Sequence, residues 1–535
     1  MPRVRERPAH STKETRIMTQ WIDAGALDDI DEDDVARFDH AGRTYAIYRI
    51  GGNVYASDGL CTHEHVHLAD GLVIDHVIEC PKHNGRFDVR DGRPLSAPAC
   101  EKLRTYRAKI DDGRILIEGM TAMATERVMA IVGAGHAGGR AAQVLRECGW
   151  RGRIVLIGAE AHLPYERPPL SKGVLTGERS AAQCQLRDPR AWAADGIEPI
   201  VATVERIDPH AREIRVAGAR TFGYDALLLA TGARARRLAI PGATLDGVLA
   251  LRTLDDAAAL GARLVPGARI VSIGAGFIGL EVAASARLRG CRVTVLDAAP
   301  RVLGRAVPAA IAARVHALHV QHGVTIRVNC APVAIERTAA GALAIVLDDG
   351  STLHADTIVA GIGIEPADEL ARDAGLRVDR GIVVDARLET SAPGIYAAGD
   401  VAVFPRGRSG RLVRQETWHG AETQARVAAR NMLGADEPYR DTPWFWSDQY
   451  DAQLQVAGDP ALGELTVARV LDDDAEIHFH FDAHARLVAA SGFGRASGFV
   501  KEMRVARMLV ERGVDVAPDA VADTNVKLKS LAAAA

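Results

Sequence analysis

One pattern occurs twice in the sequence: an apolar run, a G-x-G-x-x-G turn and an alanine-rich stretch. The first copy reads VMAIVGAGHAGGRAAQVLRE and the second reads ARIVSIGAGFIGLEVAASARLRG. A strand that passes through such a turn into a helix lets the backbone approach a pyrophosphate at the helix N-terminus. The duplication therefore predicts two dinucleotide-binding α/β units. Their candidate pyrophosphate-binding glycines are Gly133, Gly135 and Gly138, then Gly274, Gly276 and Gly279.

An acidic residue ends the next expected strand of each unit. Glu160 closes RIVLIGAE and Asp297 closes CRVTVLD. A carboxylate at this place accepts hydrogen bonds from the hydroxyl pair of a ribose. It also repels a 2′-phosphate, so the sequence predicts that the second unit binds NADH in preference to NADPH.

Two short segments nearer the N-terminus each join one cysteine to one histidine. They are Cys61-Thr-His63 and Cys80-Pro-Lys-His83. A zinc finger usually takes its cysteine pair from one turn and its histidine pair from a helix, and zinc is the alternative here. A [2Fe–2S] cluster with both cysteines on one iron and both histidines on the other matches the distribution better.

With these ligands, residues 18–119 resemble a Rieske-type ferredoxin, which implies an all-β domain. The resemblance extends to LSAPAC, where Pro98 is expected in a loop covering the cluster. TYAIYRI and VYASD flank a turn, and AKIDDGRILIEG predicts a hairpin around Asp112-Gly113. Three further histidines are interpreted as loop or surface residues near the point where electrons leave: His65, His67 and His76.

The segment departs from respiratory-chain Rieske proteins at four positions. Val66 and Lys82 stand where those proteins have two extra cysteines, and Gly85 and Phe87 stand where they have hydroxyl donors. Fewer hydrogen bonds to cluster sulfur lower the reduction potential. We therefore expect a midpoint at the low end of the Rieske range, about −150 mV.

Further motifs resemble those of flavoprotein reductases: PYERPPLSK, LLLATGARARR, IYAAGD, RQETWHGAETQA and PWFWSDQYDAQLQVAG. Over residues 128–530 the chain is similar to the NADH-dependent ferredoxin reductases of ring-hydroxylating oxygenase systems, which are related to apoptosis-inducing factor. The resemblance implies FAD in the first unit and NADH in the second. It also implies catalytic roles for Lys172 near the flavin and Glu281 near the nicotinamide. The other implied cofactor contacts are Val204, Arg236, Gly363, Asp400 and Trp418.

Tryptophans are concentrated in the last third of the chain. Trp418, Trp444 and Trp446 are expected to form an aromatic wall between the flavin and the iron–sulfur domain, with Trp418 and Trp446 as catalytic candidates. For Trp444 the alternative is a packed core of the C-terminal domain. The first glycine turn continues as GRAAQVLREC without a Cys-x4-Cys pair, which argues against a dithiol reductase.

The predicted fold class is an all-β Rieske domain followed by two Rossmann-like α/β domains and a small α+β C-terminal domain. The chain of 535 residues has room for all four. Residues 1–17 are expected to be a disordered leader or a targeting segment, with Met18 a candidate start. The other expected bounds are 18–119 (Rieske), 120–127 (linker), 128–241 with 359–434 (FAD), 242–358 (NADH) and 435–535 (C-terminal).

Composition narrows the possible partners and location. The net charge of −4 gives no sign of a nucleic-acid or anionic-membrane partner. No apolar run approaches the roughly 20 residues of a spanning helix. The five remaining cysteines are scattered, which is typical of a reducing cytoplasm.

His316, His319 and His322 recur at helical spacing and are expected on a solvated face of a helix, while His478 and His480 are given no chemistry.

We expect an NADH-dependent ferredoxin reductase fused to its own ferredoxin. FAD would convert a two-electron donor into one-electron steps for the [2Fe–2S] cluster, which would feed an external terminal oxygenase. The alternative is a redox sensor or interaction protein like apoptosis-inducing factor, with slow NADH oxidation. A complete Rieske ligand set on a short tether favours the carrier.

Overall fold

The computed structural model describes residues 19–40, 43–63, 66–96, 99, 102–120, 127–304, 306–406, 410–472, 474–495 and 497–533. The chain separates into two compact units, Met1–Thr125 and Glu126–Ala535, called the N-terminal unit and the large unit below. The expected leader and most of the expected linker lie outside the described residues. Within those residues, no helix is long and apolar enough to span a bilayer.

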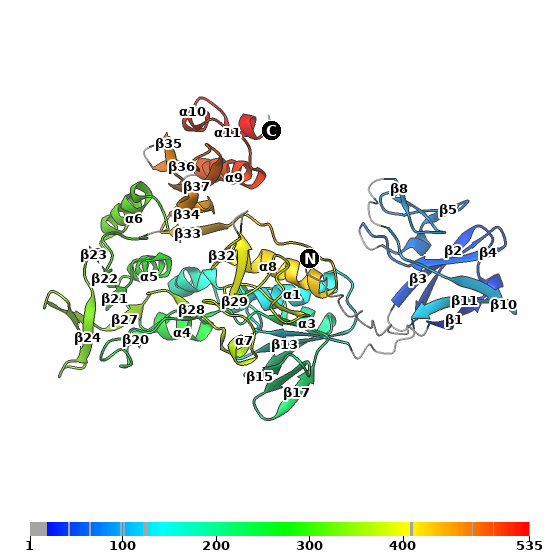
Figure 1. The fold of residues 1–535 in the computed structure, drawn as a ribbon, viewed down its shortest axis with the longest axis horizontal. Coiled ribbons are helices and arrows are strands. Elements are labelled where there is room, and N and C mark those ends of the chain that lie inside the picture. The colour runs from blue at the N-terminus through cyan, green and yellow to red at the C-terminus, as the bar shows by residue number, and fades with distance from the viewer. Residues whose placement is uncertain are drawn as a thin grey trace, which may run out of the picture. The chain divides into compact units, whose positions relative to one another are not determined.

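The N-terminal unit is built from three antiparallel sheets (Figure 1). Both predicted hairpins are confirmed: Ile50 pairs with Asn53 across one turn and Asp111 with Arg114 across the other. The sheets are β1 (Thr19–Ala26), β11 (Arg114–Met120) and β10 (Ala108–Asp111); β2 (Asp34–His40), β3 (Arg43–Ile50), β4 (Asn53–Asp58) and β9 (Thr105–Tyr106); and β5 (Leu72–Ile74), β6 (Val77–Glu79), β7 (Arg86–Asp88) and β8 (Pro94–Ser96).

The first α/β layer of the large unit is a five-stranded parallel sheet. Its order is β14 (Ile197–Val201), β13 (Arg153–Gly158), β12 (Val128–Val132), β18 (Ala226–Leu229) and β30 (Ile395–Ala397). All four residues of β18 are buried, as expected for a central strand covered on both faces. Two helices lie side by side on this sheet, α1 (His136–Glu147) and α8 (Trp418–Met432) (Figure 1).

A second parallel sheet repeats the arrangement. Its order is β20 (Val248–Leu249), β27 (Thr357–Ala360), β21 (Arg269–Ile273), β22 (Arg292–Leu296) and β23 (Thr325–Arg327). In each sheet the glycine turn follows a central strand and opens a twelve-residue helix, α1 in the first and α5 (Phe277–Leu288) in the second. This repetition confirms the internal duplication.

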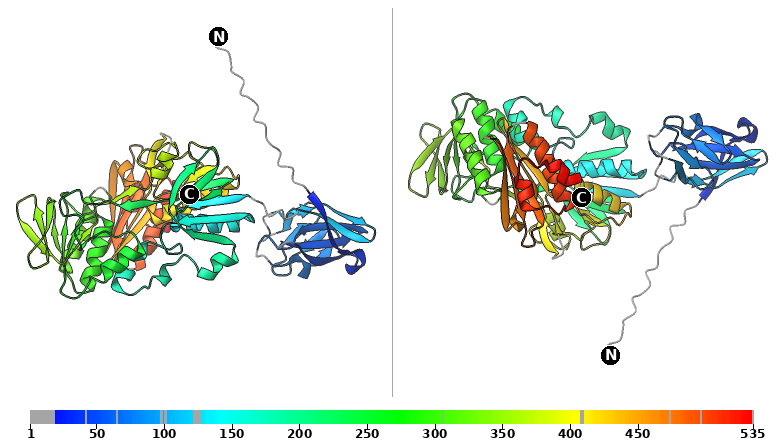
Figure 2. Two further views of the ribbon diagram at one scale, coloured as in Figure 1. Left: turned by 90° about the horizontal axis from the view of Figure 1, so that it is seen from below. Right: turned by 90° about the horizontal axis from the view of Figure 1, so that it is seen from above.

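The C-terminal part is an antiparallel sheet in the order β33 (Trp444–Gln449), β34 (Ala452–Gly458), β37 (Leu487–Gly494), β36 (Ala475–Phe481) and β35 (Leu465–Asp472). The helix α9 (Ser497–Arg512) lies against these orange strands (Figure 2). Leu454 and Phe493 of this sheet share a core with Leu280 of α5. The sheet is therefore anchored on the second α/β layer.

The large unit contains further strands and helices outside these sheets. The strands are β15 (Val204–Asp208), β16 (Glu213–Val216), β17 (Arg220–Gly223), β19 (Ala233–Ala235), β24 (Pro332–Arg337), β25 (Leu343–Leu347), β26 (Thr352–Ala355), β28 (Ile364–Pro366), β29 (Ile382–Val383), β31 (Ala402–Arg406) and β32 (Arg411–Arg414). The helices are α2 (Gly173–Thr176), α3 (Pro189–Ala194), α4 (Leu254–Gly261), α6 (Ala309–Gln321), α7 (Glu369–Asp373), α10 (Pro518–Ala522) and α11 (Leu528–Ala533). The all-β, α/β and α+β parts confirm the predicted fold class.

The expectation of a solvated histidine face on α6 is wrong for its middle member. His319 is fully buried, whereas His316 and His322 are partly exposed. Its imidazole contacts Gln449 and the ring of Tyr450, at the turn between β33 and β34. A second element therefore covers this side of the helix, which helical spacing alone does not reveal.

Candidate redox site

The four predicted cluster ligands of the N-terminal unit occupy two neighbouring loops. The Cys61 and Cys80 side chains are buried, at 2% and 3% exposure, while His63 and His83 are exposed. The two imidazole rings meet edge to face, with centroids 5.2 Å apart. The loops thus place thiols on the inside and imidazoles on the outside of one small region.

Backbone hydrogen bonds hold both loops. The Cys61 amide donates to Val66 O at 2.9 Å, and the Cys80 amide donates to Gly85 O at 2.8 Å. Among the described residues, no three His, Cys, Asp or Glu side chains gather around a single point. A two-iron cluster needs only two protein ligands on each iron, since sulfide supplies the rest. One buried thiol and one exposed imidazole per loop fit that donor set.

The nearby histidines divide. His67 is buried and hydrogen-bonded through both ring nitrogens. Its Nε2 lies 2.7 Å from Thr44 Oγ1, and its Nδ1 accepts from the Ala69 amide at 3.0 Å. His67 is thus a loop residue, as expected, but it is buried and holds the loop, so the expectation of a surface position does not apply to it. His76 is partly exposed and lies 3.3 Å from the Tyr55 hydroxyl. His65 lies outside the described residues, as does Pro98.

The positions expected to lack hydroxyl donors are both closely packed. The Phe87 ring is fully buried in the core of the unit. A Cβ on Gly85 would lie 3.2 Å from the Ala99 Cβ. Neither residue carries a hydroxyl, and the low reduction potential of the cluster stays a prediction.

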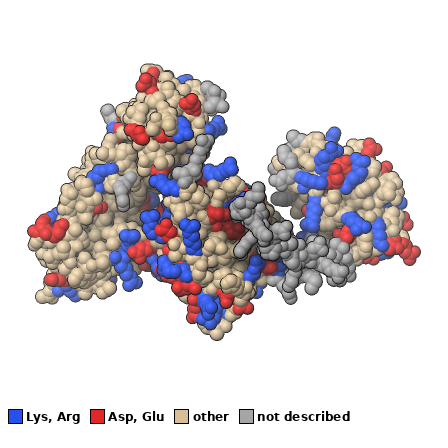
Figure 3. All heavy atoms as spheres, viewed as in Figure 1, with Lys and Arg blue, Asp and Glu red and all other residues tan. Residues whose placement is uncertain are grey.

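The large unit contains a cavity of about 2520 Å³ between its two α/β layers. This exceeds the about 300–1,000 Å³ of a typical single small-molecule pocket, so two dinucleotides have room. Arginines and carboxylates line it, and Figure 3 shows both signs of charge interspersed on the visible face. The predicted residues lining it are Gly133, Gly135, Glu160, Lys172, Val204, Arg236, Gly274, Gly276, Glu281, Asp297, Gly363, Asp400, Trp418 and Trp446.

The three glycines of each turn have different roles. A Cβ on Gly279 would lie 1.9 Å from Gly274 O, so close helix–strand packing demands glycine there. A Cβ on Gly276 would meet no protein atom within 4 Å and would project into the cavity. The first turn has a similar pattern, with Gly138 against backbone, while a Cβ on Gly135 would meet only Arg167 Nη2, at 3.8 Å. The space beside Gly135 and Gly276 is what a closely approaching pyrophosphate would require, and its binding there stays a prediction.

Both predicted ribose-binding acids already accept hydrogen bonds from the protein. Glu160 pairs with Arg167 Nη2 at 2.7 Å and accepts from the Tyr165 hydroxyl. The two oxygens of Asp297 accept from the backbone amides of Ala275, at 2.6 Å, and Ala299, at 2.7 Å. Each carboxylate oxygen keeps a second lone pair for a ligand, so ribose binding by these acids stays a prediction.

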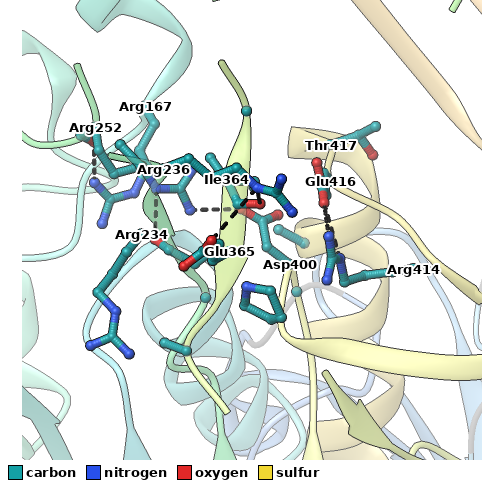
Figure 4. A pocket seen from close by; sticks show the side chains of 18 of the residues that line it. Arg167, Arg234, Arg236, Arg252, Ile364, Glu365, Asp400, Arg414, Glu416 and Thr417 are labelled. Atoms are coloured by element: carbon teal, nitrogen blue, oxygen red, sulfur yellow. Dashed lines mark hydrogen bonds and ion pairs between the residues drawn. The ribbon is translucent and has the colours of Figure 1, made fainter. Parts of the chain in front are cut away.

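Asp400 and Arg236 reach the cavity from different elements (Figure 4). Asp400 Oδ2 lies 2.6 Å from Arg252 Nη2. Arg236 Nε donates to Ile364 O at 3.3 Å and lies 3.8 Å from the Glu365 carboxylate. Their proposed contacts with FAD remain predictions, and Arg252 is a partner that the sequence did not single out.

The Lys172–Glu281 pair is the most buried charged contact of the cavity wall. Lys172 Nζ lies 2.8 Å from Glu281 Oε2, and Glu281 is 4% exposed. The hydroxyl of Ser171 donates to the same oxygen, and that of Ser447 donates to Oε1 at 2.5 Å. An ammonium and two hydroxyls offset the cost of burying this carboxylate. The pair thus joins the first layer to the second and to β33.

The predicted aromatic residues come together. The rings of Trp418 and Trp446 meet edge to face at 5.9 Å between centroids, and Trp444 stacks on Trp446 at 5.0 Å. His136, for which the sequence makes no prediction, lies with its ring centroid 5.0 Å from that of Trp418 and its Nε2 3.1 Å from a Glu422 carboxylate oxygen. Trp418 and Trp446 line the cavity, whereas Trp444 packs under Arg507. The catalytic roles of these rings stay predictions.

Comparisons with known proteins agree with the site. Three family models match: the Rieske [2Fe-2S] domain over residues 20–107, pyridine nucleotide-disulphide oxidoreductase over 127–425 and the reductase C-terminal domain over 444–532. The ferredoxin–NAD(+) reductase component of the anthranilate 1,2-dioxygenase system of Burkholderia cepacia is 44% identical over 407 residues, 75% of this chain and 98% of that protein. The corresponding p-cumate 2,3-dioxygenase component of Pseudomonas putida is 37% identical over 76% and 98%.

Solved structures give the same result. The ferredoxin reductase for the CYP199A2 system of Rhodopseudomonas palustris superposes with a TM-score of 0.72 at 38% identity, over 76% of this chain and 99% of that one. The covalent putidaredoxin reductase–putidaredoxin complex gives 0.71 at 36%, also over 76% and 99%. The chain belongs to the pyridine nucleotide-disulphide oxidoreductase family, carries a Rieske domain at its N-terminal end, and is an electron-transfer oxidoreductase that uses NADH, FAD and a [2Fe–2S] cluster.

Proposed function

We propose that this chain passes electrons from NADH through FAD to its own Rieske cluster, and from there to an external terminal oxygenase. The observation that carries the proposal is the presence, in one polypeptide, of a cavity with room for two dinucleotides and of the four predicted cluster ligands. A tether of about eight residues gives an effective concentration on the order of millimolar. Reductase and ferredoxin then need no diffusional encounter.

In the large unit, the open glycines Gly135 and Gly276 would hold the two pyrophosphates at the ends of α1 and α5. FAD supplies the conversion of a hydride, two electrons at once, into single electrons. The Lys172 ammonium, held by Glu281, would sit at the cavity wall where negative charge develops. Trp418 would close the wall beside it and exclude water.

In the N-terminal unit, the burial pattern supports an electron exit through the imidazoles. Cys61 and Cys80 would hold the inner iron, and the exposed His63 and His83 would hold the outer one. The edge that a partner protein meets is then the histidine side. The lack of a dithiol pair in the sequence after the first glycine turn argues against a disulfide as the acceptor.

The acceptor beyond the cluster is proposed to be the terminal component of an oxygenase system. Similar proteins are the reductase components of anthranilate and p-cumate dioxygenase systems. The scattered cysteines support a cytoplasmic location.

Anaerobic reduction by NADH, followed by EPR, tests the route. The expected result is flavin bleaching together with a rhombic signal of average g near about 1.9, typical of imidazole-ligated [2Fe–2S] centres. In Cys61→Ser the flavin should still bleach while this signal disappears. If NADH bleaches the flavin of the intact chain and the cluster stays oxidised, the proposed route is wrong.

A redox sensor is the second candidate, favoured only by the relation to apoptosis-inducing factor. Turnover separates the two. A carrier reduces cytochrome c rapidly with NADH, whereas a sensor holds a long-lived charge-transfer complex of reduced flavin and NAD and turns over slowly. The ligand set in the N-terminal unit supports the carrier.

A further inference from the structure

A hydrogen-bonded chain leads from Glu281 away from the cavity. Ser447 Oγ lies 2.5 Å from Glu281 Oε1, Gln449 Nε2 lies 2.9 Å from Ser447 Oγ, and His319 Nε2 lies 2.9 Å from Gln449 Oε1. The Tyr450 hydroxyl follows at 3.4 Å from His319 Nδ1. The three middle side chains are at most 1% exposed and do not line the cavity. Nothing in the proposed chemistry uses them.

The direction of each hydrogen bond follows from the groups involved. The Glu281 carboxylate pairs with an ammonium and only accepts, so the Ser447 hydroxyl donates to it. The Ser447 oxygen then accepts from the Gln449 amide nitrogen, which turns Gln449 Oε1 toward His319. His319 Nε2 must carry the hydrogen that this oxygen accepts, and Nδ1 accepts from Tyr450. Every donor in the chain points toward one buried carboxylate.

The outer members keep this direction at neutral pH. Burial lowers the pKa of His319 to about 4, so the ring is neutral and has a single N–H. Burial raises the pKa of Tyr450, so its hydroxyl keeps the proton it donates. Hydrogen bonds aligned in one direction polarise and strengthen one another in a low-dielectric interior.

The chain also connects parts of the large unit that are distant in sequence. His319 belongs to α6, Ser447 and Gln449 to β33, and Glu281 to α5. We propose that His319 is a positioning residue for the Lys172–Glu281 pair. It fixes the Gln449 amide, which fixes the Ser447 hydroxyl, which holds the Glu281 carboxylate turned toward Lys172.

The charge balance at the cavity wall therefore depends on an imidazole that lies outside the cavity. The inference rests on the proposed function in one respect, the placement of the Lys172–Glu281 pair beside the flavin. When the chain is interrupted, the Glu281 charge loses a donor and is less compensated. Reduction adds electrons next to this charge, so a bound flavin becomes harder to reduce.

Two amide substitutions at one position test the inference. The nitrogen of Gln in His319→Gln takes the place of Nε2 and still donates to Gln449. The nitrogen of Asn in His319→Asn takes the place of Nδ1 and does not reach it. The readout is the equilibrium between the flavin of the full-length, FAD-loaded protein and a reference redox dye, without NADH. Asn should shift this equilibrium about threefold or more toward oxidised flavin, the order of one buried hydrogen bond, and Gln should restore it.

A second pair of variants separates action through the chain from general damage. Ser447→Ala should give the same shift, and combining it with His319→Asn should add nothing, because both break one path. His316→Leu, three residues earlier on α6 and outside the chain, should leave the equilibrium unchanged.

Three results would overturn the inference. The first is an equal shift in the Gln and Asn variants, and the second is an additive shift when His319→Asn is combined with Ser447→Ala. The third is a comparable shift in His316→Leu. If the Asn variant does not retain FAD, Ser447→Ala carries the test, and an unchanged equilibrium there overturns it as well. The measurement involves neither NADH nor the cluster. Its failure is thus distinguishable from a failure of electron transfer between the two units.

Discussion

At the residue scale, the glycines of each turn differ in why a side chain is excluded. Some pack against backbone atoms of the fold, and others border the space where a ligand would bind. Gly279 has no room for a side chain, because a Cβ would collide with Gly274 O. Gly276 has room on the protein side and opens on the cavity. The spacing of the motif indicates three glycines, but only the structure shows which of them has open space toward the cavity.

This difference predicts that alanine affects ligand binding at Gly276 and protein stability at Gly279. Gly276→Ala should leave the thermal midpoint unchanged and weaken NADH binding about tenfold, or about 1.4 kcal/mol, because the methyl group occupies the approach of the pyrophosphate. Gly279→Ala should lower the thermal midpoint, because backbone must move. Calorimetry and NADH titration of both variants measure this. Unimpaired NADH binding in Gly276→Ala would contradict the prediction that the pyrophosphate closely approaches Gly276.

A hydroxyl near the cluster should change its potential. Phe87→Tyr adds a donor at a position where respiratory-chain Rieske proteins are expected to have one. A bond that favours the reduced cluster tenfold raises a one-electron midpoint by about 60 mV, and hydrogen bonds to sulfur act in this direction. Phe38→Tyr, a partly exposed position on β2, is the matched control. An unchanged midpoint in a folded, cluster-loaded Phe87→Tyr protein would show that Phe87 does not face the sulfur.

At the element scale, the sequence was sufficient for the glycine turns, the two hairpins and the parallel strands, since each depends on local pattern. It was not sufficient for contacts between distant elements. Asp400 and Arg252 are 148 positions apart, and Glu281 and Ser447 are 166 apart. The error at His319 has the same cause, because the turn after β33 decides which face of α6 is buried.

Two buried histidines should make the stability of the large unit depend on pH. Burial lowers the pKa of both His319 and His480 to about 4. In the unfolded chain a histidine binds a proton below about pH 6.5, whereas these two resist protonation until about pH 4. Stability is therefore lost as the pH falls from about 6.5 toward 4, by up to about 1.4 kcal/mol per pH unit for each.

Denaturation followed by tryptophan fluorescence at pH 7.5, 6 and 5 measures this dependence. In His480→Gln the loss between pH 6 and 5 should be smaller than in the unmodified protein, since one of the two groups is gone. The same loss in both proteins would mean that His480 is protonated in the folded state at these pH values.

At the scale of the whole molecule, the chain combines a Rieske domain with a reductase, whereas the reductase component of the anthranilate system is covered to 98% by 75% of this chain. The similar reductases match about 75% of the chain, while the Rieske model matches residues 20–107. If electrons pass within one molecule, as proposed, fusion would replace a bimolecular encounter by an intramolecular one, whose rate would not depend on protein concentration. This fusion would distinguish the protein from a separate reductase and ferredoxin.

Stopped-flow mixing of the full-length protein with NADH tests this most directly. Flavin bleaching followed by cluster reduction should be observed, and the rate of the second phase should stay constant when the protein concentration is raised tenfold. A second-phase rate that rises in proportion to protein concentration would mean that electrons pass between molecules, and would contradict the account.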